Sequence, residues 1–175
     1  RRMGKILNGK GKVIVTKFMP GSGSTINREN GFIETIEKEF PDIEIVDTKY
    51  GMATVETALQ AAEDLLTKHT ELDGLYASNA STSVGSAQAL QSQGRTDNIK
   101  MVGFDAEETL IDKLRSGVVD SLVVQDPYKM GYTGVKTLVD KINGKEVPKL
   151  IDTGVELVTL ERLEEPKIKA LLNLK

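Results

Sequence analysis

Short apolar runs that end in polar residues recur about every thirty residues along the chain, and a helical pattern follows each of them. The clearest run is residues 99–105, where an apolar stretch ends in Phe104 and Asp105. Runs of this length, bounded by turn signals, are typical of strands buried on both faces of a parallel sheet. The alternation of strands and helices therefore predicts an α/β fold, a doubly wound, Rossmann-like parallel sheet with helices on both faces.

Six strands are expected, at residues 12–18, 43–46, 72–78, 99–105, 121–126 and 150–159, and the last is interrupted at Thr153 and Gly154. The clearest helix has Thr54 as its expected N-cap, because apolar residues recur after it at the i, i+3, i+4 spacing. Further helices are expected at residues 2–8, from Ser24 or Thr25 to 40, at 81–93, at 107–116 and at 127–144. The residues after 159 read as a charged tail. Since no linker divides the chain, residues 1–175 are expected to form a single α/β domain.

Composition excludes several classes of function. The chain of 175 residues has a net charge of −3, which gives no electrostatic reason to expect nucleic acid as a partner. Cysteine is absent, so there is no disulfide framework and no thiolate chemistry. No apolar stretch approaches the roughly 18 residues that a membrane-spanning helix needs. Residues 1–4 look like the interior of a longer sequence instead of a natural N-terminus, and the start of the chain carries no signal-peptide pattern.

Hydrogen-bonding side chains collect at the expected carboxyl ends of the strands and in the first turns after them. They are Arg28, Asn79, Phe104 with Asp105, and Gln125 with Asp126. In open α/β sheets ligands bind outside these strand ends. For any one of these positions helix capping by Asn or Asp is the favoured explanation. Capping requires neither Phe104 nor Gln125, however, and planar polar groups around an aromatic ring suit a polyhydroxylated ligand.

The evidence for an enzyme is weak. The only imidazole, His69, stands at the expected end of the long helix, where a solvated residue near the helix C-terminus is favoured over a base or a metal ligand. The glycine-rich residues 21–24 lack the lysine and hydroxyl pair of a phosphate-binding loop and the spacing of a dinucleotide site. Asp47, Asp105 and Asp126 are the candidates for paired carboxylates in a hydrolase or a nucleotide-dependent enzyme. We expect no catalysis, no metal and no cofactor.

Five motifs resemble the sugar-binding type I periplasmic proteins, of which the ribose-binding proteins of ABC importers are the nearest type. The motifs are residues 28–32, 75–79, 102–105, 123–127 with Gly131, and 154–159, in the family's order and spacing. The resemblance implies the type I periplasmic-binding-protein fold. Proteins of this family have two similar α/β lobes, which are joined by three crossovers and close on a sugar between them.

The resemblance also implies a role for each site residue. Arg28 and Asn79 would bind sugar hydroxyls, and Asp105 would accept hydrogen bonds from them. Phe104 would form an apolar wall, and Gln125 would bind near a crossover. Two positions depart from the pattern. Ala80 stands where the family usually has an aspartate, and the region of Tyr50 aligns poorly, so Tyr50 is only a candidate for the family's aromatic residue there.

The chain resembles the second, C-terminal lobe of such a protein, with the first lobe missing. The helix at 127–144 would pack on that first lobe. Its apolar positions would otherwise be exposed at a cost of several kcal/mol, at roughly 25 cal/mol per Å². They are Val135, Leu138, Val139 and Ile142. Without its partner, the helix is expected to fold onto its own lobe or to pair with a second copy in a homodimer.

The function implied is the binding of a monosaccharide, ribose or another, for import by an ABC transporter. The partners would be the sugar and a membrane permease, and the location would be periplasmic or extracellular. The alternative is the effector-binding domain of a lactose-repressor-type transcription regulator, which shares the fold and the Val-Gly-Phe-Asp pattern of residues 102–105. The ending at residues 154–159 resembles the binding proteins more than the repressors.

Overall fold

The computed structural model describes residues 1–174 and contains one six-stranded sheet in the order β2-β1-β3-β4-β5-β6. Neighbouring strands are parallel except β5 and β6, which are antiparallel. The doubly wound α/β fold is confirmed. The elements are α1 (Arg2–Ile6), β1 (Lys10–Lys17), α2 (Gly23–Glu39), β2 (Asp42–Tyr50), α3 (Val55–Lys68), β3 (Gly74–Ala77), α4 (Ala80–Ser92), β4 (Lys100–Phe104), α5 (Glu108–Arg115), β5 (Ser121–Gln125), α6 (Pro127–Ile142), β6 (Val155–Thr159), the short 3-10 helix η1 (Leu160–Arg162) and α7 (Pro166–Leu172).

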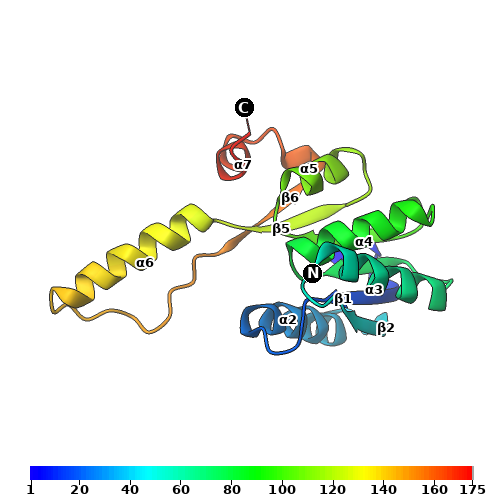
Figure 1. The fold of residues 1–175 in the computed structure, drawn as a ribbon, viewed down its shortest axis with the longest axis horizontal. Helices are drawn as coiled ribbons and strands as arrows, with labels where there is room; N and C mark the ends of the chain where they lie inside the picture. Colours follow the sequence, from blue (N-terminus) through cyan, green and yellow to red (C-terminus); the bar gives the residue numbers. More distant parts are fainter. Residues whose placement is uncertain (175) are drawn as a thin grey trace.

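The sheet is covered on both faces. Alternate residues of β1 enter different cores: Val13 and Val15 pack with α1 and α2, whereas Ile14 packs with α3 and α4. In Figure 1, α3 and α4 lie on one side of the strands and α2 on the other. From β1 the chain moves to β2 on one side, whereas from β3 it moves to β4 and β5 on the other side. Because each crossover is right-handed, α2 and α4 lie on opposite faces of the sheet. The switch point of the sheet therefore lies between β1 and β3.

Small residues bring α4 unusually close to its neighbours. A Cβ atom added at Gly85 would lie 2.6 Å from the backbone nitrogen of Leu59 and 2.7 Å from the carbonyl oxygen of Val55. Any larger residue at Gly85 would therefore push α3 away from α4. This close packing fixes α4 against α3, and the first turn of α4 reaches the end of β4 through Ser83.

Most expected elements are confirmed, with boundaries shifted by a few residues. Thr54 caps α3, since its side chain accepts a hydrogen bond of 3.2 Å from the backbone N–H of Thr57. The expected cap of α2 is wrong: the helix begins at Gly23 after Ser22, ahead of Ser24 and Thr25. The hydroxyl of Thr25 instead donates to the carbonyl of Ser22 inside the first turn.

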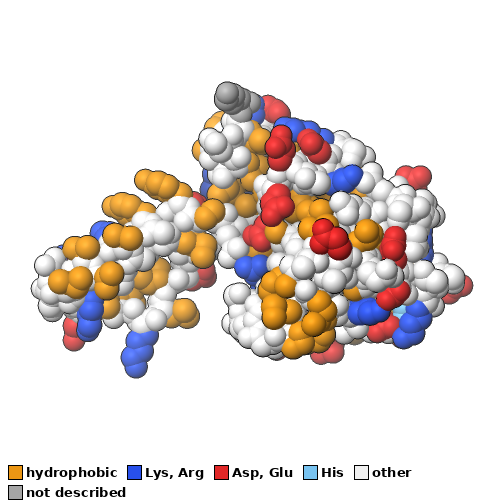
Figure 2. All heavy atoms as spheres, in the orientation of Figure 1, with side chains coloured by type: hydrophobic (Ala, Val, Ile, Leu, Met, Phe, Trp, Pro, Cys, Tyr) orange, Lys and Arg blue, Asp and Glu red, His pale blue; other side chains and the backbone are white. Residues whose placement is uncertain are grey.

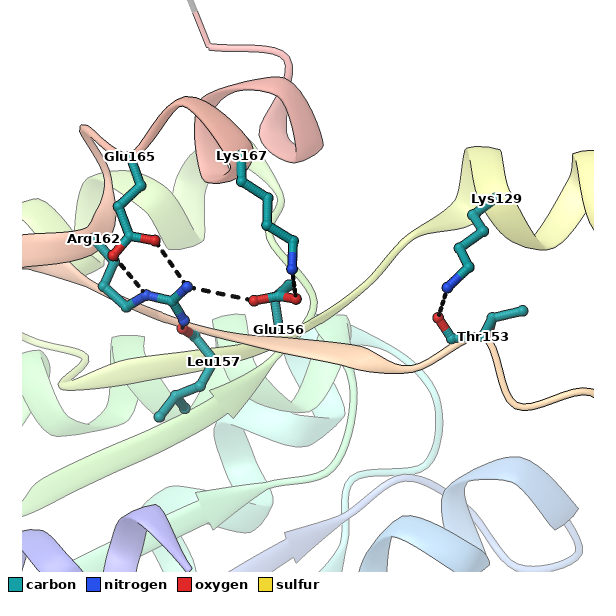
Figure 3. A network of polar contacts seen from close by, with 7 residues as sticks. All are labelled: Lys129, Thr153, Glu156, Leu157, Arg162, Glu165 and Lys167. Carbon is teal, nitrogen blue, oxygen red and sulfur yellow. Dashed lines mark hydrogen bonds and ion pairs between the residues drawn. The ribbon is translucent and has the colours of Figure 1, made fainter.

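The end of the chain differs most from expectation. The last strand begins at Val155 instead of residue 150, and the expected charged tail contains α7, whose Ile168 is completely buried in the core. Figure 3 shows the polar contacts that join η1 and α7 to β6: Glu156 of β6 accepts from Lys167 of α7 at 2.5 Å and from Arg162 of η1 at 3.4 Å. Because ion pairs near the protein surface contribute little, the burial of Ile168 is the main attachment of α7 to the rest of the domain.

The helix α6 projects from the rest of the domain as an arm, with the returning segment 143–154 beside it (Figure 1). None of its residues is buried, so the expectation that it would fold onto its own lobe is wrong. The reason is local. Only Asp126 separates the end of β5 at Gln125 from the start of α6 at Pro127, so there is no loop in which the chain could turn back. Lys129 Nζ donates to the carbonyl of Thr153 at 2.9 Å and so joins the two sides of the arm (Figure 3).

A second polar cluster lies on β2, away from the arm. The Asp47 carboxylate accepts hydrogen bonds from Lys68 Nζ at 2.7 Å and from the backbone N–H of Thr48 at 2.8 Å, and its Oδ2 lies 2.9 Å from His69 Nε2. The bonds to Lys68 and His69 lower the pKa of Asp47 to about 2. The His69 side chain is 22% exposed, so it is a half-buried structural residue instead of the solvated one expected.

We expect Asp47→Asn to reduce the free energy of unfolding at pH 7 by about 1–2 kcal/mol. A carboxylate with a lowered pKa stabilises the fold above its ordinary pKa of 3.8, and this contribution disappears as the pH falls toward about 2. Urea unfolding at several pH values should therefore show the two proteins converging in acid. The control is Asp112→Asn, which removes an exposed ion pair with Arg115 and should change little at any pH. A loss that persists unchanged at pH 2 would contradict this account.

Candidate ligand-binding site

The five site residues expected from the sequence lie together at the carboxyl edge of the sheet. Asn79, Phe104 with Asp105, and Gln125 stand at the ends of β3, β4 and β5, which are adjacent strands. Arg28 reaches this edge from α2, and its Nη1 donates to the carbonyl of Ser78 at 3.1 Å. A continuous set of contacts therefore runs across three strand ends.

Arg28 lies on the ring of Phe104. The guanidinium carbon is 3.8 Å from the ring centroid, and Phe104 is only 5% exposed. A cation over an aromatic face is attracted by the ring's electrons. In this structure Phe104 thus serves as the platform for Arg28, whereas the sequence suggested an open apolar wall.

A hollow of about 210 Å³ lies beside this pair on the α2 face of the sheet. Arg28 and Phe104 line it together with Tyr76 of β3, whose ring stacks on Phe32 of α2 with centroids 4.3 Å apart. Burial raises the pKa of the Tyr76 hydroxyl well above its usual range. Tyr76 is therefore a neutral group that stiffens the support beneath Arg28.

Ser83 of α4 fixes the end of β4. Its hydroxyl accepts from the backbone N–H of Phe104 at 2.8 Å and donates to the carbonyl of the same residue at 3.2 Å. The close approach depends on Gly103, where an added Cβ would lie 3.0 Å from Ser83 Oγ. Both backbone groups of Phe104 are thus satisfied, and the orientation of the next residue, Asp105, is set.

Asp105 has the left-handed conformation, with φ of 69°. Aspartate tolerates this region better than most residues, and such strain is often found at ligand sites. The backbone N–H of Asp105 donates to the carbonyl of Val123 at 2.9 Å, and one carboxylate oxygen accepts from Gln125 Nε2 at 3.2 Å. The result is a partly exposed acceptor that is held by the neighbouring strand.

Asn79 and Asp126 act as helix caps. Asn79 forms a capping box at the start of α4: Oδ1 accepts from the backbone N–H of Thr82 at 3.2 Å, and its own N–H donates to Thr82 Oγ1 at 3.1 Å. Asp126 accepts from the backbone N–H of Lys129 at 2.8 Å at the start of α6. The capping explanation weighed for these two positions therefore applies, and the ligand role of Asn79 stays a prediction.

Two further candidates lie away from this cluster. Tyr50 ends β2, with Lys17 Nζ 5.7 Å from its ring centroid. Since β1 and β3 separate β2 from β4, Tyr50 is on the order of 14 Å from Phe104 along the edge. His69 follows α3, whose 14 residues span about 20 Å from the site edge toward the opposite edge.

The described part of the chain offers no metal site, since within it no three His, Asp or Glu side chains are grouped to hold an ion. In residues 1–174 there is likewise no helix of the length and apolarity needed to cross a membrane.

Sequence reasoning missed Glu29 and Ser78. Glu29 is 2% exposed and Ser78 is completely buried, and the two side chains are hydrogen bonded at 2.9 Å directly beneath Arg28. A signal was present, because Glu29 falls at helical spacing from Phe32 and Ile36 on the apolar face of α2. A charged residue on a buried helix face needs polar partners.

Comparison with known proteins gives consistent matches. A family model described as "Periplasmic binding protein domain" matches residues 1–146. The ribose import binding protein of Bacillus subtilis is 26% identical over 152 residues, which cover 86% of this chain and 48% of that protein. The D-allose-binding periplasmic protein of Escherichia coli is 28% identical over 139 residues, which cover 79% of this chain and 44% of that protein. This chain thus spans about half the length of these relatives.

Among solved structures, a carbohydrate transporter solute-binding protein from Agrobacterium radiobacter, in complex with D-arabinose, superposes with a TM-score of 0.90. It is 35% identical, and the match covers 98% of this chain and 59% of that one. None of these matches favours the transcription-regulator alternative. Because the family model covers residues 1–146, most of its length, this chain belongs to the periplasmic binding protein family.

Proposed function

We propose that this chain is the second lobe of a two-lobe protein that binds a monosaccharide for import by an ABC transporter. The observation that carries the proposal is the fixed array of Arg28, Asp105 and Gln125 at one sheet edge. A guanidinium and an amide supply donors, and a carboxylate supplies acceptors, in orientations that the fold sets in advance. Such groups match the paired hydroxyls of a sugar.

The proposed role is binding without chemistry. Asp105 is engaged by Gln125, and the only imidazole lies at the far end of α3, so the edge holds no pair of nucleophile and base. Selectivity would come from hydroxyl pairing, because a site built for a hydroxyl leaves buried groups unpaired when that hydroxyl is missing.

The two-lobe arrangement is supported by α6. Its exposed apolar side chains recur at spacings of three and four residues, so they form a stripe along one side of the helix. Figure 2 shows orange, hydrophobic side chains on the projecting part of the molecule. The stripe consists of Tyr128, Tyr132, Val135, Leu138, Val139 and Ile142. An exposed stripe of this length marks an interaction surface. We infer that a first lobe covers it in the complete protein and that residues 127–144 are the contact.

The transport role rests on the relatives, whose names describe import and periplasmic binding. In the complete protein, the two lobes would close on the sugar, and a membrane permease would recognise the closed form. The protein would then act in the periplasm or outside the cell, and a cofactor would have no part in it.

The first test is a thermal-shift panel of pentoses and hexoses on a protein in which a first lobe precedes this chain. Arg28→Ala and Asp105→Ala should each reduce the stabilisation by the best sugar strongly, because each removes a charged hydrogen-bonding group. The matched controls, Arg115→Ala and Asp97→Ala, change exposed residues at the opposite end of the lobe and should leave it unchanged. If stabilisation survived both site substitutions, the site would be wrong.

The second prediction concerns this chain alone. A half-site cannot enclose a sugar, so titration calorimetry should give a Kd of roughly 1 mM or weaker, or no measurable heat. Micromolar binding by the isolated chain would refute the half-site and would require a complete pocket within it or within a dimer.

The third prediction concerns the α6 stripe. Without a first lobe, we expect the isolated chain to self-associate through this stripe, since the exposed apolar surface costs several kcal/mol at roughly 25 cal/mol per Å². Sedimentation equilibrium should show a dimer that Leu138→Glu converts to a monomer. Lys141→Glu, placed away from the stripe, should leave the dimer intact. A wild-type chain that stays monomeric at high concentration would exclude self-association by this surface.

A further inference from the structure

Glu29 of α2 carries a carboxyl group that is buried at a cost in free energy. It is 2% exposed, although a buried carboxyl is tolerated only with good hydrogen bonds. Its Oε1 accepts two: from the backbone N–H of Phe18 at 3.0 Å and from the hydroxyl of Ser78 at 2.9 Å. Simple capping of α2 does not explain these bonds, because both donors lie outside the helix.

The two donors lie immediately beyond the neighbouring strands β1 and β3. Phe18 follows Lys17, the last residue of β1, and Ser78 follows Ala77, the last residue of β3. The strand pairing ends at Thr16 and Ala77, so Glu29 joins the two chains just after the ladder stops. This junction is the switch point of the sheet, where the chain leaves β1 toward one face and β3 toward the other.

Ser78 connects Glu29 to the site. Its carbonyl accepts from Arg28 Nη1 at 3.1 Å, and the next residue is Asn79. Glu29 follows Arg28 directly in the chain, and its Oε1 accepts hydrogen bonds from Phe18 and Ser78. The guanidinium of Arg28, bonded to the Ser78 carbonyl, lies over the Phe104 ring at 3.8 Å from its centroid.

We infer that Glu29 is a positioning residue of the binding site. By holding Ser78, it fixes the carbonyl that orients Arg28 and the backbone from which Asn79 projects, without touching the ligand. The effect on sugar affinity rests on the proposed function, whereas the effect on Arg28 does not.

The first test uses nuclear magnetic resonance on this chain without ligand. The Phe104 ring should shift the side-chain resonances of Arg28 upfield. Glu29→Ala and Ser78→Ala should both move these resonances toward their unstructured values, and Glu29→Gln, which keeps an acceptor oxygen, should restore most of the native shift.

The matched control is Ser86→Ala, which also removes a buried hydroxyl bond, one of 3.0 Å to Thr16 Oγ1, but lies further along α4. It should leave the Arg28 resonances in place. Unchanged Arg28 resonances in both Glu29→Ala and Ser78→Ala would overturn the inference, and so would an equal change in Ser86→Ala.

The second test measures sugar affinity in the two-lobe protein. Glu29→Ala should weaken binding roughly tenfold, as expected for the loss of one hydrogen bond involving a charged group. Combined with Arg28→Ala, the two losses should be less than additive, because Glu29 acts largely through Arg28. Additive losses would overturn the positioning role. Absence of sugar binding in the wild-type protein would refute the proposed function, and the Arg28 resonances would still decide the role of Glu29.

Discussion

Burial of the central parallel strands on both faces is the constraint from which the rest of this structure follows. The central strands are completely buried at Val13, Ile14, Val15 and Leu75. Polar side chains that could meet a ligand are therefore restricted to the ends of these strands. At those ends the ladder stops, and the backbone groups need other partners. Ser83 supplies them for both backbone groups of Phe104 at the end of β4, and Glu29 supplies one for the backbone N–H of Phe18 after β1 while it also holds the hydroxyl of Ser78 after β3. The groups that complete the sheet thereby also fix the backbone at its carboxyl edge, where the candidate site lies.

Much of the fold could be predicted from the sequence, because strand and helix periods are local properties. The apolar run at residues 99–105 and the spacing after Thr54 each fix an element with little outside information. The end of the chain could not be predicted in the same way. The attachment of α7 depends on Ile168 entering a core built by residues far away in the sequence, and the charged residues around it concealed the helix.

The candidate site was partly predictable for a similar reason. Parallel strands end at a common edge, so Asn79, Asp105 and Gln125 were brought together by topology alone. What the sequence could not show is which polar atoms are already engaged. Asn79 is committed to its capping box, and Phe104 is covered by Arg28, and both facts depend on contacts between separate elements.

The domain departs from ordinary burial in two opposite ways, and the two departures lie in different places. Glu29 is a buried carboxyl group at the switch point, whereas α6 presents exposed apolar residues on an arm. In the proposed function, the buried polar group supports the binding site and the exposed apolar stripe is an interaction surface. Gln125 links the arm to the candidate site: it is the last residue of β5, it stands two residues before α6, and it donates to Asp105. A displacement of the arm that carries Gln125 with it therefore also moves a donor away from the carboxylate of the site.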